Sequence, residues 1–141
     1  MSVDKLDLDI VTPERLVLAT AVDEVVLPGS EGYLGVLPGH APLLTGIRPG
    51  PVKLKFDNGE EGVFFVSGGF LEIQPSVVTV LANTAVRAED IDEAAVIEAK
   101  QAAERVLADR AAGFEFSVAA ARLAEAMARE RTLDALRKRR R

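Results

Sequence analysis

The sequence contains no cysteine, and its single histidine is His40. The lack of cysteine excludes disulfide frameworks, thiolate metal sites and thiol catalysis. No apolar run approaches the ~18 residues that a membrane-spanning helix needs, and the start of the chain lacks a signal-peptide pattern. A length of 141 residues with 48% hydrophobic side chains suits one ordinary domain, or a small domain with an appendage. We therefore expect a soluble intracellular protein, for which docking onto a membrane complex stays open.

Signatures of catalysis are also missing. No nucleophile motif and no cluster of metal ligands accompanies His40, so a structural or interface role is favoured for it over catalysis. Gly29, Gly32 and Gly35 lie three residues apart, which does not match the dinucleotide fingerprint, and no Gly-Lys-Ser/Thr sequence occurs. We interpret these glycines as turn residues. We expect no catalytic residue, no metal and no cofactor.

The glycine, proline and alanine content changes abruptly along the chain. Residues 1–87 hold ten of the eleven glycines, all seven prolines and five alanines, whereas residues 88–141 hold one glycine, no proline and sixteen alanines. Glycine and proline mark turns between short strands, whereas alanine is the strongest helix former. The sequence therefore predicts two parts, a β domain over 1–87 and a helical region over 88–141.

The first part has the pattern of many short strands. Apolar residues alternate with aspartates from Leu6 to Ile10, which is the period of a half-buried strand. Two apolar stretches follow and are predicted to part near Thr20, and the sequence 57–59 (Asp-Asn-Gly) predicts a tight hairpin. Strands at this density, with no helical period between them, favour a β-sandwich or barrel over an α/β fold.

The second part carries signals for two helices. Asp90 and Glu93 have the spacing of a capping box, Gly113 is a natural helix stop, and Ser117 is a candidate cap of a second helix. The short link predicts an antiparallel hairpin. Its two predicted contact stripes are Ile91, Ala95, Ala99, Ala102 and Val106, and then Ala120, Leu123, Ala124, Met127 and Ala128. Because alanine buries little apolar area, at ~25 cal/mol per Å² the hairpin should be weakly held and detachable.

The charges are strongly segregated. Net charge is −5 over residues 1–87, −5 over 88–128 and +5 over 129–141. A solvated helix end, an acidic protein partner and nucleic acid all remain open for this cationic tail. It has no aromatic residue to stack on nucleotide bases and too little apolar area for membrane insertion. Its cations are Arg129, Arg131, Arg137, Lys138, Arg139, Arg140 and Arg141.

Taken in order, several segments resemble the epsilon-subunit family of bacterial-type F1Fo ATP synthases, called delta in mitochondria. The resemblance covers nearly the whole chain and fades only in the basic tail. The segments that carry it are 11–15 (VTPER), 22–29 (VDEVVLPG), 35–44 (GVLPGHAPLL), 64–73 (FFVSGGFLEI), 78–82 (VTVLA) and 87–92 (RAEDID).

The resemblance implies a ten-stranded β-sandwich followed by an antiparallel two-helix hairpin. It also implies a non-catalytic rotor subunit, peripheral on the cytoplasmic face of the bacterial membrane. In this family the sandwich grips the gamma subunit and stands on the c-subunit ring, coupling proton or sodium flow to ATP synthesis. The resemblance places Glu31, Gly32 and Tyr33 in the ring-facing loop, with Tyr33 replacing an acid found in some members. It places Thr12, His40 and Thr45 near the gamma and ring contacts.

The resemblance further implies a regulatory hairpin. In the family the helices either fold onto the sandwich or extend into the catalytic head, where they obstruct ATP hydrolysis. The seven tail cations would then meet acidic loops of the catalytic beta subunits, beside alpha. Some members bind ATP in the folded hairpin. Of that motif Ile91, Asp92 and Arg129 remain here, but Ala95 stands at an arginine position, so we expect weak or absent ATP binding.

A rival interpretation is a free-standing sandwich with a basic helical arm for nucleic acid. A salt-dependent DNA shift would support it, whereas co-purification with gamma would support the rotor interpretation. The resemblance favours the rotor, and with it the absence of a nucleic-acid partner.

Overall fold

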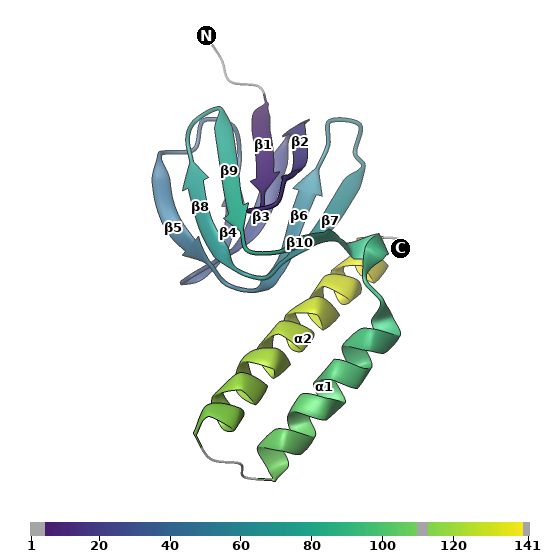
Figure 1. Ribbon diagram of the computed structural model, residues 1–141. Coiled ribbons are helices and arrows are strands. Elements are labelled where there is room, and N and C mark those ends of the chain that lie inside the picture. Colours follow the sequence, from purple (N-terminus) through teal and green to yellow (C-terminus); the bar gives the residue numbers. More distant parts are fainter. Residues whose placement is uncertain (1–4, 110–112, 140–141) are drawn as a thin grey trace.

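The computed structural model describes residues 5–109 and 113–139. The first part of the chain forms strands and the second part forms helices (Figure 1). The strands are β1 (Leu6–Val11), β2 (Leu16–Val22), β3 (Glu24–Gly29), β4 (Gly32–Val36), β5 (Leu43–Ile47), β6 (Gly50–Lys55), β7 (Glu61–Val66), β8 (Gly69–Ile73), β9 (Val77–Ala82) and β10 (Ala85–Arg87). After them come a 3₁₀ turn η1 (Ala88–Asp90) and the helices α1 (Glu93–Ala108) and α2 (Phe114–Arg139).

The ten strands form one continuous sheet that folds over on itself into two layers. Its strand order is β10-β7-β6-β3-β5-β8-β9-β1-β2, and β4 pairs with β3 beside this path. The two layers meet where Gly29 of β3 pairs with Ile47 of β5. Neighbours are antiparallel except β1 and β9, which run parallel. The predicted sandwich with a helical hairpin is therefore confirmed.

The sandwich core follows from alternation along the strands. Leu6, Leu8 and Ile10 of β1 are fully buried, as the period-2 pattern predicts, and they pack in one cluster with Val25 and Leu27 of β3. Burying such a side chain contributes about 1.5–3 kcal/mol. This rigid core holds the outer faces and the connecting loops in place.

Strand β7 is buried on both of its faces. Phe64 and Val66 belong to the sandwich core, whereas Val63 and Phe65 lie in two smaller clusters with the helical region. Helix α2 contacts β6 and β7 through its C-terminal half, and its N-terminal half projects away from the sandwich beside α1 (Figure 1). The hairpin is therefore anchored at one end only.

Two glycines meet geometric needs in the sheet. In the predicted 57–59 hairpin, Gly59 has φ +84° and the side chain of Asn58 accepts a 2.9 Å hydrogen bond from the Glu60 amide, so that prediction is confirmed. Gly69 begins β8 with φ +142°, and a Cβ atom there would lie 1.9 Å from the carbonyl oxygen of Leu81. Only glycine permits the close approach of β8 to β9.

The predicted break near Thr20 is wrong. Strand β2 continues through Thr20, which pairs with Leu8 of β1, and the chain turns instead at Asp23. The Asp23 amide donates a 2.8 Å hydrogen bond to the Lys55 carbonyl, and its carboxylate pairs with Lys5. An acidic residue therefore marks this turn, where the sequence offers neither glycine nor proline.

The predicted helix starts also need correction. The cap of α1 is Asp92, whose side chain accepts a 3.2 Å hydrogen bond from the Ala95 amide, while Asp90 lies in η1. Ser117 lies inside α2, which begins at Phe114. The stripe predicted for α2 is wrong apart from Ala128, because alanines on every side of the helix gave no indication of which face is buried. The buried residues of α2 are Ala119, Ala126, Ala128, Thr132, Leu133 and Leu136.

Candidate functional site

An apolar row crosses the outer face of the layer that contains β8, β9, β1 and β2. Phe70 lies opposite Leu81, Leu81 opposite Val11, and Val11 opposite Leu16, so the four residues form one line across four strands. Phe70 is 60% exposed, Leu16 56% and Leu81 52%. Adjacent exposed apolar side chains of this size are typical of a protein contact surface.

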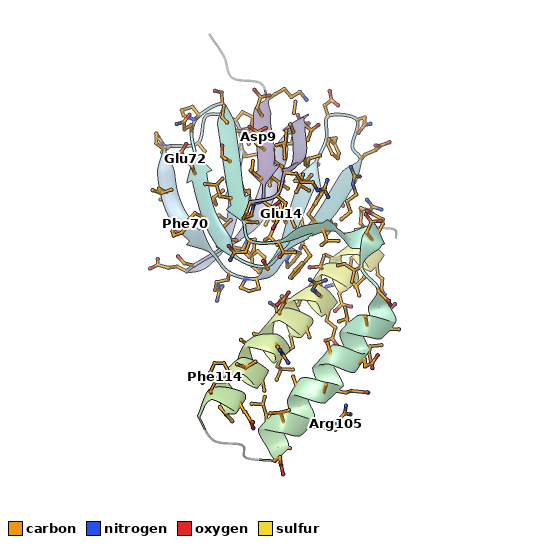
Figure 2. The ribbon with its side chains drawn as sticks, in the orientation of Figure 1. Asp9, Glu14, Phe70, Glu72, Arg105 and Phe114 are labelled. Atoms are coloured by element: carbon orange, nitrogen blue, oxygen red, sulfur yellow. The ribbon has the colours of Figure 1, made fainter. Side chains whose placement is uncertain are left out.

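Carboxylates border the apolar row along the same face. Glu72 of β8 pairs with Thr79, which pairs in turn with Asp9 of β1, one pleat away from the row. Figure 2 shows Asp9, Glu72 and Phe70 on this layer, away from the helical hairpin. The face therefore combines an apolar stripe with an acidic margin, which suits a partner that presents apolar and basic groups.

The loop between β3 and β4 carries the predicted ring-facing residues. Glu31 is exposed at the turn between the paired residues Gly29 and Gly32. Ser30 fixes this turn, because its amide donates to the Gly46 carbonyl at 3.0 Å and its hydroxyl lies 3.1 Å from that of Thr45. A carboxylate is therefore held at the tip of an anchored loop. Tyr33, on β4 beside the turn, is half-exposed.

Of the three residues predicted near the gamma and ring contacts, two lie at the same end of the sandwich. Thr12 follows Val11, which is aligned across the sheet with Gly46, the neighbour of Thr45. His40 lies at the opposite end, in a loop whose Gly39 amide donates to the Pro75 carbonyl. Thr12, Thr45 and the Glu31 loop can therefore share one contact surface, and His40 lies apart from it.

The basic tail contacts the chain's own sandwich. The Arg129 guanidinium lies 4.5 Å from the centre of the Phe65 ring and 3.3 Å from the Glu125 carboxylate. Arg131 donates to the Pro49 carbonyl at 3.2 Å. Arg139 donates to the Glu61 carbonyl at 2.6 Å and pairs with Glu89 of η1 at 3.3 Å. These cations hold α2 against β6, β7 and η1.

The remaining tail cations differ in their surroundings. Arg137 bridges Glu93 of α1 and Asp134 of α2, and the hydrogen bond with Glu93 is the main reason that its pKa lies above the ordinary value. Lys138 is exposed. Arg140 and Arg141 lie outside the described residues. The predicted cationic surface is thus partly occupied by internal contacts in this conformation.

A groove of about 810 Å³ runs between the two helices. Four residues of the predicted α1 stripe line it, and so do Asp92 and Arg129 from the nucleotide motif; the four are Ala95, Ala99, Ala102 and Val106. Asp92 also caps α1, and Ile91 is buried against Phe65 in the docking cluster. The carboxylate of Glu125, which also lines the groove, is paired with Arg129. The groove is therefore mostly apolar, and its best-placed cation is already engaged by an acid.

Within the described ranges 5–109 and 113–139, no group of three or more acidic or histidine side chains is arranged to hold a metal ion. In the same described part of the chain, neither α1 nor α2 is both long and apolar enough to cross a bilayer.

Two features of the site were missed at the level of sequence. The apolar row could have been found from the run 77–82, which is almost wholly apolar. A strand with one solvent-exposed face should instead alternate apolar and polar residues. The stacking of Arg129 on Phe65 had no sequence signal, since the two residues are distant in the chain and meet only when the hairpin docks.

Comparison with known proteins gives consistent matches over nearly the whole chain. Residues 5–88 match the β-sandwich domain of the ATP synthase delta/epsilon chain, and residues 89–133 match its long α-helix domain. The chain is 52% identical over 134 residues to the ATP synthase epsilon chain of Alkalilimnicola ehrlichii, covering 95% of this chain and 96% of that one. It is 49% identical over 129 residues to the epsilon chain of Chromohalobacter salexigens, covering 92% of each.

Solved structures share the fold. A chain in the mitochondrial ATP synthase of Euglena gracilis, solved with OSCP, F1 and the c-ring, superposes with a TM-score of 0.74 at 21% identity, covering 98% of this chain and 82% of that one. A chain in the central stalk and c-ring of the Tetrahymena thermophila mitochondrial enzyme gives a TM-score of 0.51 at 17% identity, covering 64% and 72%.

Proposed function

Because this chain belongs to the delta/epsilon chain family of ATP synthases, we propose that it is a rotor subunit that joins the c-subunit ring to gamma and restrains ATP hydrolysis through its hairpin. In this role it performs no chemistry itself. It resides peripherally at the cytoplasmic face of the bacterial membrane, as part of the synthase complex.

The sandwich supplies the coupling contacts. The observation that carries this proposal is the apolar row, which stays exposed on a face that the docked hairpin leaves uncovered. We assign this face to gamma, and the Glu31 loop at the adjoining end to the polar or basic loops of the c-ring. Two contacts on one rigid sandwich would transmit torque, since neither surface can move relative to the core that joins them.

Loss of gamma binding tests the first assignment. Phe70→Glu and Leu81→Glu place a carboxylate in the row without changing the buried side of either strand, so the sandwich should fold and bind gamma at least about tenfold more weakly. Ile97→Glu is a matched control, because Ile97 is an exposed aliphatic residue on α1, away from the row. Gamma binding that is equally strong in all three variants would refute the assignment.

The hairpin supplies the restraint on hydrolysis. When it is docked, Arg129, Arg131 and Arg139 contact the chain's own sandwich and η1, so they cannot also meet an acidic loop on a catalytic beta subunit. Undocking would release them. The two helices face each other largely through small alanine side chains, and only one end of the hairpin packs on the sandwich, so we take the gap between the two states to be within the few kcal/mol that a switch can cross.

Two variants of the same helix should change ATPase activity in opposite directions. Leu133 is buried in the docking cluster, so Leu133→Ala should release the hairpin with its cations intact and lower the ATPase rate of the assembled enzyme. Ending the chain after Ala128 removes the cations themselves and should raise the rate, most clearly at low salt. Met127→Ala, at a half-exposed position, is the control. An unchanged rate in the truncated enzyme would contradict the proposed brake.

A further inference from the structure

A charged side chain lies at the base of the Glu31 loop, on the connection between β5 and β6. The amide of Arg48 donates a 2.8 Å hydrogen bond to the Pro28 carbonyl, and its Nε donates a 3.1 Å hydrogen bond to the Gly29 carbonyl. Both carbonyls belong to the end of β3, from which the chain enters the turn that carries Glu31. The backbone and the side chain of Arg48 therefore both attach this arginine to the loop that we assign to the c-ring.

The base of this loop is tightly constrained. Gly29 pairs with Gly32 of β4 and with Ile47 of β5, so three strands meet there. A Cβ atom at Gly29 would lie 2.9 Å from the Gly32 carbonyl oxygen, so the turn closes without room for a side chain. Most surface ion pairs contribute little, partly because a long side chain must be immobilised to form them. The Nε hydrogen bond already restricts Arg48, so less conformational entropy is lost when it meets a partner.

The positive charge of Arg48 is not neutralised by the chain itself. Within residues 5–109 and 113–139, no ion pair involves Arg48 or Glu31, and both residues are exposed. The neighbouring cation, Arg131 of α2, donates instead to the carbonyl of Pro49. Adjoining segments at this end of the sandwich therefore present one carboxylate and one guanidinium that do not pair with each other.

The chemistry of the two groups restricts what can face them. A guanidinium has five donors and no acceptor, and it stays charged at any physiological pH. With Nε used internally, the two terminal nitrogens of Arg48 can still bind both oxygens of one carboxylate. Glu31 requires a basic or polar group. A partner that satisfies both must carry an acidic group close to a basic or polar one.

We propose that Arg48 is a second charged contact to the c-ring and binds an acidic side chain on the c-subunit loops that face Glu31. This inference rests on the proposed function, since it takes the ring as the partner of the loop. Two contacts of opposite sign fix the orientation of the sandwich on the ring, because a single contact leaves it free to pivot. Arg48 also selects the partner, since a basic residue in place of the acid would be repelled.

Binding of the purified c-ring to the complex of this chain with gamma tests the proposal. Arg48→Gln should weaken ring binding about tenfold at low salt and make it less sensitive to salt, because one charge-assisted contact is lost. Arg48→Lys keeps the charge and should bind nearly as well as the parent. Arg105→Gln is the matched control, since it removes one exposed cation at the far end of α1 (Figure 2). All three variants should bind gamma like the parent.

Glu31→Gln separates this inference from the proposed function. If Glu31→Gln weakens ring binding and Arg48→Gln does not, the Arg48 contact is refuted and the ring assignment stands. If neither change weakens ring binding, the ring assignment is refuted and this inference with it.

Two further outcomes would overturn the Arg48 contact. Equal weakening in Arg48→Lys and Arg48→Gln would mean that the arginine only holds the loop through its Nε hydrogen bond. Equal weakening in Arg105→Gln and Arg48→Gln would mean that the ring attracts positive charge in general.

Discussion

The Arg129 guanidinium stacks over the ring of Phe65 at 4.5 Å from its centre. Phe65 is fully buried although it belongs to a sandwich strand and points away from the sandwich core. The pair joins the middle of α2 to β7. At this point the Arg129 cation of the hairpin is covered by the sandwich domain.

Removing either side of this pair should loosen the docked hairpin. Arg129→Met keeps most of the side-chain length without the charge, and Phe65→Leu keeps an apolar filling without the π system. A double-mutant cycle on these two changes should give a coupling energy of about 0.5–2 kcal/mol, the range for cation–π contacts. Amide exchange of α2 in the full chain measures it. Strictly additive effects would mean that the stacking does not stabilise docking.

Gly69→Ala should destabilise the sandwich itself. The added Cβ would lie 1.9 Å from the Leu81 carbonyl oxygen at a residue with φ +142°, so β8 and β9 would have to separate. We expect a loss of at least about 2 kcal/mol in the free energy of unfolding. Gly35→Ala in β4, where nothing lies within 4 Å of the new atom, is the control. Urea unfolding compares the two variants, and equal midpoints would contradict the steric argument.

The groove between the helices should bind ATP weakly or not at all. Ala95 and Ala102 offer no charge there, and Arg129 is occupied by Phe65 and Glu125. The phosphate chain would therefore meet a mostly apolar wall and a carboxylate, with Arg122 as the one other cation among the described residues that line the groove. Calorimetry on the full chain should show no micromolar affinity in this groove. Binding of that strength that is lost in Arg122→Gln and kept in Lys53→Gln would overturn this prediction.

The ion pair between Lys5, just before β1, and Asp23 makes the stability of the sandwich depend on pH in a direction that can be predicted. The hydrogen bond with Asp23 is the main cause that raises the pKa of Lys5 above its ordinary value of 10.5, and Asp57 adds to it from 3.4 Å. A raised pKa for a cation means that its contribution is complete below 10.5 and disappears as pH rises through the folded-state value. Lys5→Met should therefore be less stable than the parent at neutral pH and equally stable at strongly alkaline pH. A difference in urea midpoint that persists unchanged at alkaline pH would exclude this origin.

The parts of the fold that follow from local rules could be predicted from the sequence. Alternation identified β1, the Asp-Asn-Gly turn identified the β6–β7 hairpin, and alanine content identified the helices. The predictions that went wrong depended on contacts between distant residues. Thr20 stays in a strand because Leu8 pairs with it, and the buried face of α2 is selected by β6 and β7 rather than by its own sequence.

The candidate site shows the same division. The Glu31 loop could be located from its glycines and from family resemblance. The opposite placement of His40 and Thr12 could not, because it depends on the register of β8 with β5 and β9. The internal partners of the tail cations were equally hidden. A charge pattern shows that cations are clustered, but only the docked structure shows that three of them are occupied by a carbonyl, a ring or a carboxylate.

The parallel pairing of β1 with β9 dictates the order in which the molecule can be assembled on the ribosome. Strand β1, which contains Leu8, cannot pair on both sides until β9, which contains Val78, has been synthesised. The first strand made is therefore among the last to complete its hydrogen bonding. Such distant pairing slows folding, and the early strands have exposed apolar edges until it is complete. Because α2 is synthesised last and docks on β6 and β7, this helix is added to a finished scaffold. A chain interrupted before α2 can therefore still form the sandwich, which under the proposed function would join the rotor without its brake.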